Sequence, residues 1–495
     1  MAAKKFGITT KKADNFSEWY SQLCGEEGAQ LVDQRYGIQG FVVYREWGFA
    51  LLRRLYELLE EAVEADGHEA FMFPVVIPKA YLEKEEEHAG FTPEVFWLTK
   101  GGDTDLAEPY AMRPTGETQL YPMYSLWIRS HNDLPYKRYQ TRHMCYRNDS
   151  GTRPFLRGRE FCFFETHDVF ATHEEAMEQI NTDMKIMEDV VWKQLKVPFI
   201  FFRRPKWDAF LGANYTYASD SLVPDGKRLQ VSSTHDLGHN FAKAFDVTFK
   251  DKNNKEQFGY QTCFGPGIIR IIAALIAIHG DDNGLILPST MAPVKAVIVP
   301  ITFSKDKEKT EKVLKTCESL QAQLKKAGLK VVFDTTADES PGFKYNKWEL
   351  KGVPVRIEVG PKEVEQGKST MVARVDGKKN PVANKDLAKA IFKSLEEQDQ
   401  IIEEKAKQYF ANNTREATTL DEIKKIMKEH RGFIKIPWCD VTATGEECAD
   451  ILKAETNGAY VTGEAYVKPE KPKAGAKCPV CSKAAKHVVY VCKSY

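Results

Sequence analysis

Residues 147–161 read Arg-Asn-Asp-Ser-Gly-Thr-Arg-Pro-Phe-Leu-Arg-Gly-Arg-Glu-Phe, and they predict a β-hairpin that presents several cations on one side. A strand that ends at Arg147 is followed by a polar loop, and a second strand opens at Arg157. Arginine suits polyphosphate ligands because its planar guanidinium group donates two hydrogen bonds to paired oxygens. Phe161, on the returning strand, offers a flat face on which a nucleobase can stack. The hairpin therefore indicates an antiparallel sheet with a site for an anionic, base-carrying ligand.

The sequence around this hairpin mixes helices and strands without regular alternation. Aromatic and β-branched residues concentrate at 139–147, 160–170 and 198–203, which is typical of strands. Apolar residues recur at helical spacing from about 45 to 65, and an apolar stretch at 71–77 predicts another strand. We therefore expect an α+β fold in which helices flank a largely antiparallel sheet.

The pattern changes near residue 290. Strands are predicted at 294–300, 329–333 and 353–359, with a helix at about 306–327 between the first two. This order predicts a compact α/β domain, which is followed by a charged helical stretch at about 384–430 and a cysteine-rich tail. The expected domains are residues 1–290, 291–395 and 396–495.

Two further polar elements accompany the hairpin. Arg270 follows a glycine-rich turn and stands at the start of an apolar helix, where a buried arginine needs an anionic partner. The segment Arg113-Pro-Thr-Gly-Glu-Thr118 places Thr115 and Glu117 together, and these side chains suit an ammonium group. The sequence therefore indicates sites for an anion and for an amine.

The composition is that of a globular protein, with 42% hydrophobic and 28% charged residues and a formal net charge of zero. The most apolar run, Ile268 to Ile278, contains Arg270 and is too short to cross a membrane. The N-terminal residues carry no apolar stretch typical of a secretory signal. We therefore expect a cytoplasmic protein with no membrane contact.

Half of the ten cysteines lie close to the C-terminus. Cys478-Pro-Val-Cys481 has the two-residue spacing of half of a structural zinc site, and Cys439 and Cys448 supply the other half. Eight residues separate Cys439 from Cys448, more than the spacing of about two to four that is common in such sites. The loop between them must therefore bulge, or Cys492 must serve as a ligand instead.

These motifs together resemble those of the class II aminoacyl-tRNA synthetases. Pro74 after a long helix is similar to motif 1, the hairpin to motif 2, and Gly265–Arg270 to motif 3. Residues 113–118, 155–161 and 341–354 resemble the prolyl-tRNA synthetases specifically. The resemblance runs from about residue 15 to Tyr495 and is greatest to the archaeal and eukaryotic type, which carries a zinc-binding C-terminal domain.

The resemblance implies a role for each matched residue. Arg147 and Arg270 are implied as catalytic residues, on the α-phosphate and the γ-phosphate of ATP. Proline binding is implied for Thr115, Glu117, Arg147, Phe163, Glu165, His167 and His235. ATP binding is implied for Arg147, Asp149, Arg157, Phe161, Gln230, Ser233 and Arg270.

The resemblance also implies partners and cofactors. Tyr345, Glu349 and Arg356 match positions that read the anticodon of tRNA(Pro). The implied cofactors are ATP as a substrate, Mg²⁺, and a structural Zn²⁺ bound by Cys439, Cys448, Cys478 and Cys481. A homodimer is implied, with the motif 1 helix and strand at its interface.

The chain departs from the family pattern in several places, and other functions remain open at this point. Asp149 stands where glutamate is usual, and motif 3 reads Gly-Pro-Gly-Ile-Ile-Arg rather than Gly-Leu-Thr-Thr-Arg. Another class II synthetase, such as the threonyl or glycyl enzyme, shares the three motifs. A non-catalytic, synthetase-like tRNA-binding protein is the third possibility, but the presence of Arg147 and Arg270 favours an enzyme.

Overall fold

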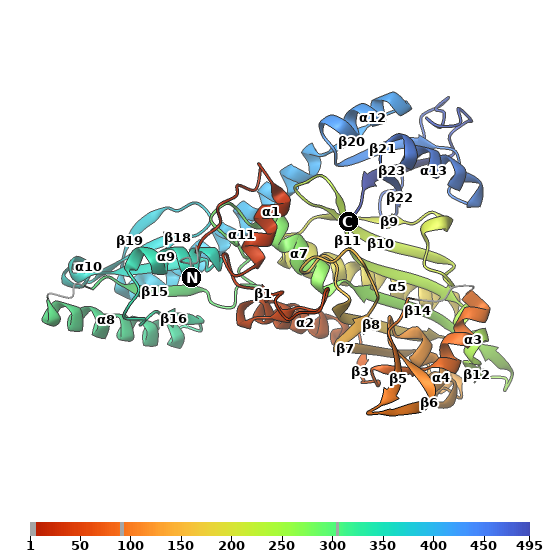
Figure 1. The fold of residues 1–495 in the computed structure, drawn as a ribbon, viewed down its shortest axis with the longest axis horizontal. Coiled ribbons are helices and arrows are strands. Elements are labelled where there is room, and N and C mark those ends of the chain that lie inside the picture. The colour runs from red at the N-terminus through yellow and green to blue at the C-terminus, as the bar shows by residue number, and fades with distance from the viewer. Residues whose placement is uncertain (1–5, 90–93, 303–305) are drawn as a thin grey trace.

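The computed structural model of the chain describes residues 6–89, 94–302 and 306–495. A large central sheet carries the hairpin, a separate smaller sheet lies at one end of the molecule, and the C-terminal segment stands above the central sheet (Figure 1). Among the described helices, none is both long enough and apolar enough to span a bilayer.

The central sheet is antiparallel over most of its width, as predicted. Its strand order is β20-β21-β23-β22-β9-β10-β11-β14-β8-β7-β3, and only the outermost pairs at its two edges are parallel. Its strands from the first part of the chain are β3 (Glu69–Ala70), β7 (Tyr136–Tyr146), β8 (Glu160–Phe170), β9 (Phe199–Arg203), β10 (Tyr215–Leu222), β11 (Arg228–Gly238) and β14 (Tyr260–Pro266). The hairpin of residues 147–161 joins β7 to β8.

Three helices pack on one face of this sheet and bury the main hydrophobic core. They are α2 (Glu46–Ala65), α5 (His173–Met187) and α7 (Ile268–His279). Successive side chains of a strand point to opposite faces. Phe164 and Phe264 therefore pack into this core, while their neighbours Phe163 and Gly265 line a cavity on the other face.

A small three-stranded sheet, in the order β4-β6-β5, covers the edge of the central sheet near β7 and β3. Its elements and neighbours are β4 (Val76–Pro78), α3 (Lys79–Ala89), β5 (Trp97–Gly101), β6 (Thr104–Met112) and α4 (Glu117–Trp127). The strand predicted at 71–77 was wrong for most of its length, because residues 71–75 lie between β3 and β4. Phe71 and Phe73 pack edge to face and join an aromatic cluster with Tyr124, so their hydrophobicity reflects core packing.

The second sheet has the order β16-β15-β17-β18-β19, with β15 parallel to both of its neighbours. This arrangement confirms the predicted α/β fold of this segment. Its elements are β15 (Ala296–Pro300), α8 (Lys307–Lys326), β16 (Val331–Phe333), α9 (Pro341–Leu350), β17 (Val355–Val359), α10 (Pro361–Gln366), β18 (Lys368–Ala373) and β19 (Lys379–Ala383).

The C-terminal segment extends the central sheet rather than standing apart from it. β22 pairs with β9, with Glu464 opposite Arg203. The helical stretch predicted at 384–430 consists of two helices with a short strand between them, and the first helix, α11, links the two ends of the molecule (Figure 1). The elements are α11 (Leu387–Asn412), β20 (Thr414–Glu416), α12 (Leu420–Glu429), β21 (Phe433–Trp438), α13 (Glu446–Glu455), β22 (Ala459–Ala465) and β23 (His487–Lys493).

The remaining elements are short or peripheral. They are α1 (Phe16–Cys24), β1 (Val32–Asp33), β2 (Val43–Tyr44), α6 (Asn240–Phe245), β12 (Thr248–Lys250) and β13 (Glu256–Phe258). The boundary expected at residue 395 falls within α11, so one continuous helix carries the chain across it.

Candidate active site

A cavity of about 460 Å³ opens on the face of the central sheet opposite the three helices. All of its described lining residues lie between Pro114 and Arg270. The structure brings together here most of the residues that the sequence singled out, namely Thr115, Glu117, Arg147, Asp149, Arg157, Phe161, Phe163, Gln230, Ser233, His235 and Arg270.

Three arginines converge on this cavity from two elements. Arg147 and Arg157 belong to the hairpin between β7 and β8, and Arg270 lies in the first turn of α7. Burial lowers the pKa of Arg270 to about 10, and the cationic neighbours Arg157 and Arg147 act in the same direction. In the described part of the chain Arg157 pairs with Asp149 at 3.4 Å, whereas Arg270 forms no ion pair. The cavity therefore holds excess positive charge that a polyanion would neutralise.

Phe161 and Phe163 project from β8 with their rings edge to face at 5.8 Å between centroids. Across the cavity, the amide oxygen of Gln230 accepts a hydrogen bond from Arg204 at 3.1 Å. Arg204 is held by Asp220 through two hydrogen bonds of 2.7 and 2.8 Å, in a buried ion pair. This network leaves the amide NH₂ group of Gln230 as its hydrogen-bond donor toward a ligand.

A second group of side chains forms the amine end of the cavity. Glu117 is buried at the start of α4, where it accepts a hydrogen bond from the hydroxyl of Thr115. A fixed carboxylate beside a hydroxyl suits a protonated secondary amine, which needs one negative charge and one further acceptor.

Glu165 and His167 do not line the cavity but lie buried beside it. His167 Nε2 is 3.0 Å from Glu165 Oε2, and both side chains are excluded from solvent. Burial acts to lower the pKa of His167, but the Glu165 carboxylate outweighs burial and raises it. Burial likewise acts to raise the pKa of Glu165, while His167 and His143 hold it well below the usual range. Both shifts favour the ionised form of the pair, which supports the wall of the site from behind.

His235 lies on the opposite wall and has the opposite electrostatic character. Burial lowers the pKa of His235 to about 3, and the nearby His167 acts in the same direction. Its Nδ1 is 3.0 Å from the hydroxyl of Thr216, and its Nε2 is 3.0 Å from the hydroxyl of Ser233. A neutral imidazole here adds no charge that would repel an ammonium group bound at Glu117.

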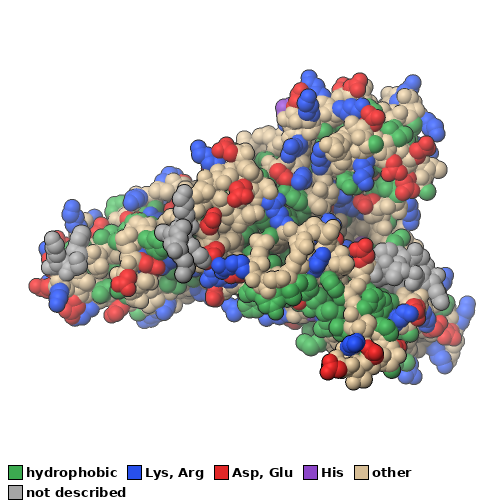
Figure 2. Space-filling model, viewed as in Figure 1, with side chains coloured by type: hydrophobic (Ala, Val, Ile, Leu, Met, Phe, Trp, Pro, Cys, Tyr) green, Lys and Arg blue, Asp and Glu red, His purple; other side chains and the backbone are tan. Residues whose placement is uncertain are grey.

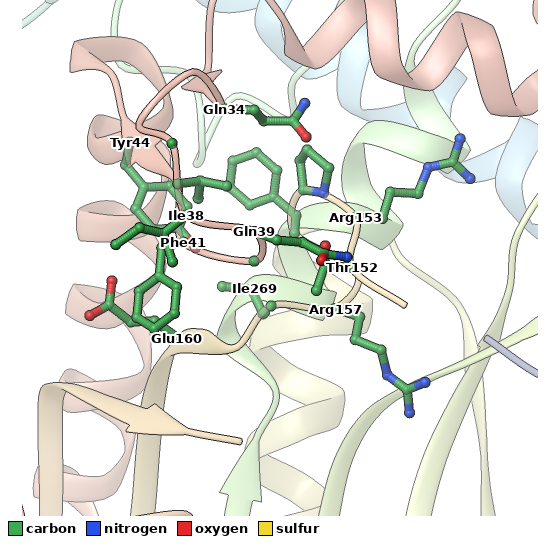
Figure 3. A pocket seen from close by; sticks show the side chains of 16 residues that line it. Gln34, Ile38, Gln39, Phe41, Tyr44, Thr152, Arg153, Arg157, Glu160 and Ile269 are labelled. Carbon is green, nitrogen blue, oxygen red and sulfur yellow. The ribbon is translucent and has the colours of Figure 1, made fainter. Parts of the chain in front are cut away.

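A smaller cavity of about 230 Å³ lies behind the hairpin, between it and the loop of residues 34–44. Figure 3 shows Arg153 and Arg157 of the hairpin pointing away from each other. Arg157 lines both cavities, while Arg153 hydrogen-bonds to Ser17 in α1 and lines only the smaller one. The loop supports the hairpin through hydrogen bonds from Arg159 N to Gly40 O at 2.9 Å and from Gln39 to Ser150 O at 3.0 Å.

The sequence interpretation missed two parts of the site. Cys263 lies in register with His235 on β11 and His167 on β8, which places it on the cavity floor. Ala209, Phe210 and Leu211, from the loop between β9 and β10, form another wall. The strand pairing that aligns Cys263 is not visible in a single sequence, and the loop residues carry no motif.

Glu117, His167 and Cys263 have potential ligand atoms within 4.8 Å of one another. Burial acts to lower the pKa of His167, but Glu165 raises it, and a raised pKa opposes metal binding by this imidazole. Burial raises the pKa of the Cys263 thiol well above its ordinary value. We therefore regard these three residues as part of the amine pocket and not as a metal site.

A second candidate site lies on the smaller sheet. Glu349 and Arg356 line a cavity of about 100 Å³, together with Trp348, Arg374 and Lys379, which the sequence interpretation did not select. Arg356 Nε donates a hydrogen bond of 3.0 Å to Glu358, and its Nη2 forms an ion pair with the same carboxylate at 2.9 Å. The guanidinium carbon of Arg356 lies 4.2 Å from the ring centroid of Tyr345. Tyr345 thus supports Arg356 from outside the cavity.

The four predicted cysteine ligands meet in the C-terminal segment. The sulfur atoms of Cys439, Cys448, Cys478 and Cys481 lie within 4.8 Å of one another, and those of Cys439 and Cys448 are 3.8 Å apart. Tetrahedral zinc with Zn–S bonds of about 2.3 Å needs sulfur atoms about 3.8 Å apart, so the geometry fits this ion. Cys492 is buried elsewhere, with its thiol directed at Gly226 O, and is not needed as a fifth candidate.

The fold and this cavity define a class of protein. An antiparallel sheet backed by helices, with hairpin and helix-turn arginines on its open face, is the core of a class II aminoacyl-tRNA synthetase. Family models agree: residues 96–279 match the tRNA synthetase class II core domain (G, H, P, S and T). Residues 295–394 match the anticodon binding domain, and residues 420–495 match the C-terminal domain of prolyl-tRNA synthetase.

Curated relatives and solved structures narrow this class to one family. The chain is 48% identical to the proline–tRNA ligase of Thermofilum pendens and 37% identical to that of Pyrococcus abyssi, over 99% and 98% of each chain. The prolyl-tRNA synthetase of Giardia lamblia in complex with prolyl-adenylate superposes with a TM-score of 0.93 at 34% identity, over 99% of this chain and 100% of that one. The enzyme from Cryptosporidium parvum, complexed with halofuginone and AMPPNP, gives 0.92 at 32% identity, over 99% of both chains. This chain belongs to the prolyl-tRNA synthetase family.

Proposed function

We propose that this chain activates L-proline with ATP to give prolyl-adenylate and pyrophosphate, and then transfers the prolyl group to the 3′ end of tRNA(Pro). One observation carries the proposal: three arginines and the Thr115–Glu117 pair face a single cavity. This combination fits an anionic triphosphate and a cationic amine held side by side.

Each residue that the sequence predicted for this site receives a role in this proposal. Thr115 and Glu117 bind the secondary ammonium group of proline, with Phe163 and His235 around the pyrrolidine ring. Glu165 and His167 act on this pocket from behind the wall, through their ion pair. Phe161 stacks on adenine, with Gln230, Ser233 and Asp149 on the ATP side of the cavity. Arg157 and Arg270 bind the phosphates, and Arg147 contacts both the proline carboxylate and the α-phosphate.

These residue types suit adenylate formation. The proline carboxylate is ionised at neutral pH, so its oxygen attacks the α-phosphorus without a general base, and the bond to pyrophosphate breaks. The protein contributes in-line placement of the two reactants and fixed positive charge where negative charge spreads. Mg²⁺ bound to the ATP phosphates supplies further charge neutralisation.

Recognition of the tRNA is assigned to the smaller sheet. Guanine offers N1 and N2 donors to a carboxylate and O6 and N7 acceptors to an arginine. Glu349 and Arg356 line one small cavity and present these two groups, and Tyr345 supports Arg356. We assign this cavity to an anticodon guanine of tRNA(Pro).

The C-terminal cysteines are assigned to a structural Zn²⁺. Four thiolate ligands leave no open coordination position, so the ion stabilises the fold and takes no part in the reaction. All ten cysteines are free thiols, which accords with a reducing compartment such as the cytoplasm. We keep the division into residues 1–290, 291–395 and 396–495 as a proposal for the domains.

A homodimer is the proposed assembly. Hydrophobic side chains gather on the surface around α2 and the preceding loop in Figure 2. Tyr36, Ile38, Val43 and Phe49 are exposed there. Exposed apolar patches of this kind mark protein interfaces, and this one includes the motif 1 helix.

The experiment that tests the function is ATP–pyrophosphate exchange in the presence of each of the twenty amino acids, without tRNA. Exchange that depends on proline supports the proposal. Exchange with a different amino acid would keep the class II fold and overturn the pocket assignment. Absence of exchange with all twenty would favour a non-catalytic tRNA-binding protein.

A further inference from the structure

The loop between β9 and β10 connects the cavity to the C-terminal segment. Its far end supplies Ala209, Phe210 and Leu211 to the cavity wall. Its near end, Arg204–Trp207, contacts the C-terminal segment. One short stretch of chain therefore touches both parts of the molecule.

Three contacts attach the near end to the C-terminal segment. Arg204 Nη1 donates a hydrogen bond of 2.8 Å to Thr462 O on β22. Lys206 N donates one of 2.9 Å to Val441 O. Trp207 packs against the hydrophobic core that contains the four-cysteine cluster.

Trp207 meets a particular turn of that segment. Residues 440–447, between Cys439 and Cys448, comprise a short turn, the 3₁₀ helix Ala443–Gly445 and the first two residues of α13; we call these residues the clasp. A Cβ atom built on Gly445 would lie 3.1 Å from Cη2 of Trp207, so the indole ring rests directly on this glycine. Lys206 and Trp207 thus both contact the clasp, and a cysteine of the cluster flanks it on each side.

Specific contacts also fix the far end of the loop. Phe210 N donates a hydrogen bond of 2.8 Å to the hydroxyl of Thr216, which is 3.0 Å from Nδ1 of His235. The ring centroids of Phe210 and His235 are 4.8 Å apart. Phe210 therefore sets the orientation of His235, and only two residues separate it from Trp207.

We propose that Trp207 is a positioning residue: by anchoring the loop on the clasp, it holds Phe210 against His235 and thereby sets the affinity for the amino acid. The C-terminal segment contributes to the pocket in this way although none of its described residues lines the cavity. The assignment of the amino acid as proline rests on the function proposed above. Loops that carry binding residues need such anchors, because a loop without them samples many conformations.

The test compares Trp207→Ala with the conservative Trp207→Phe and with Trp192→Ala. Trp192 is a matched control, because it is also half-buried and packs on β9 through Phe199 at 5.5 Å, but on the helical side of the sheet. In proline-dependent pyrophosphate exchange, Trp207→Ala should raise KM for proline about tenfold, with kcat and KM for ATP changed less than about twofold. Trp207→Phe should restore most of the affinity, and Trp192→Ala should leave KM for proline unchanged.

Amide hydrogen exchange of the full-length protein without substrate provides a readout independent of activity. Trp207→Ala should speed exchange in peptides that cover residues 206–214 and leave the hairpin 147–157 unchanged. Amide hydrogen exchange at residues 206–214 that is unaltered in Trp207→Ala would overturn the positioning role. A loss of proline affinity in Trp192→Ala equal to that in Trp207→Ala would overturn it as well. Absence of proline-dependent pyrophosphate exchange in the unmodified protein would instead overturn the proposed function. The amide hydrogen exchange of Trp207→Ala would still decide whether Trp207 anchors the loop.

Discussion

At the scale of single residues, burial and neighbouring charge decide which groups are charged in the cavity. Arg270 is partly buried beside two other arginines and forms no ion pair within the described residues, so the cavity has excess positive charge that favours anions. Burial lowers the pKa of His235 to about 3, which favours its neutral form, while Glu165, 3.0 Å from His167, raises the pKa of His167 and favours its protonated form. The two histidines lie on β8 and β11, on either side of β14, and their pKa values shift in opposite directions from that of a free histidine, which titrates near neutrality.

Arg157 and Arg153 offer a matched test at this scale, since both belong to the same hairpin. We expect Arg157→Ala to raise KM for ATP at least about tenfold in pyrophosphate exchange, because it removes a guanidinium group from the phosphate site. Arg153→Ala should change KM for ATP less than about threefold, because Arg153 points away toward Ser17 (Figure 3). Equal effects of the two substitutions would contradict the assignment of Arg157.

The Glu165–His167 pair predicts a pH-dependent contribution to stability. The pKa of His167 is raised in the folded protein, so its stabilising contribution is complete below its unfolded value and is lost as pH rises through the folded value. The pKa of Glu165 is depressed, so its contribution is present at neutral pH and is lost only in acid. Both contributions are therefore full between about pH 5 and 6.

We expect Glu165→Gln to lower Tm by about 4–8 °C at pH 6, the effect of roughly 2 kcal/mol in a domain of this size. At pH 9 the decrease should be smaller by half or more, because His167 is then closer to neutral in both proteins. Thermal denaturation followed by circular dichroism at the two pH values measures this difference. A decrease of the same size at both pH values would show that the pair is not ionised.

At the scale of secondary-structure elements, loops and helix starts present the functional groups, and the sheets hold them in place. The hairpin between β7 and β8, the first turn of α7 and the start of α4 each supply charged groups to one cavity. On the smaller sheet, the last turn of α9, the strand β17 and the residue after β18 supply Glu349, Arg356 and Arg374 to another cavity. Separate elements for activation and for tRNA recognition predict that the two can be damaged independently.

Substitution of Glu349 or Arg356 by Ala should therefore impair tRNA charging and spare activation. We expect KM for tRNA to rise about tenfold or more, since a good base contact contributes about 1–3 kcal/mol. Pyrophosphate exchange without tRNA should remain within about twofold of the unmodified protein. Lys312→Ala, on the exposed face of α8, is the control for charge changes on the same domain. A parallel fall in exchange would remove the anticodon assignment.

The cysteine cluster predicts a clear difference between two cysteines of the C-terminal segment. Cys478→Ser should reduce bound zinc from about one ion per chain to a small fraction and lower Tm, because three thiolates bind the ion weakly. Cys492→Ala should retain the zinc, since its thiol lies outside the cluster and points at Gly226 O. Metal content measured by mass spectrometry on protein purified without chelators decides between them.

At the scale of the whole molecule, the pairing of β22 with β9 joins the C-terminal segment to the central sheet. This continuity means that the C-terminal segment shares a core with the sheet that carries the cavity, as the packing of Phe202 against Phe433 and Tyr490 illustrates. The surface around α2, by contrast, remains apolar and exposed in the single chain.

A charged substitution on α2 tests the proposed dimer. Phe49 is 56% exposed there, and Phe49→Asp should weaken dimerisation at least about tenfold, because a carboxylate would be buried at the interface. Val467→Asp is the control, since Val467 is 64% exposed on the C-terminal segment, away from this patch. Light scattering after size exclusion should give twice 56.3 kDa for the unmodified chain and for the control. A measured mass of 56.3 kDa for the unmodified protein at micromolar concentration would contradict the proposed dimer.

The sequence by itself determined the features that depend on local pattern. The helix 46–65, the hairpin around residues 147–161, the α/β character of the second sheet and the class II motifs all follow from periodicity and residue type over short stretches. The same is true of the four cysteines, which the structure brings together despite their unusual spacing. These features were predictable because neighbours in the sequence supply most of the information.

Only the tertiary structure decided the features that depend on pairing between distant segments. Residues 71–75 are as hydrophobic as a strand, but they lie outside the sheets, and only Phe71 and Phe73 pack into a core, where Phe71 contacts Tyr124. The alignment of Cys263 with His167 and His235 needs the register of three strands. The protonation of His167 and His235 and the attachment of Trp207 to the clasp depend on neighbours far away in the sequence. Burial and cross-strand register are properties of the folded chain, so no local pattern in the sequence encodes them.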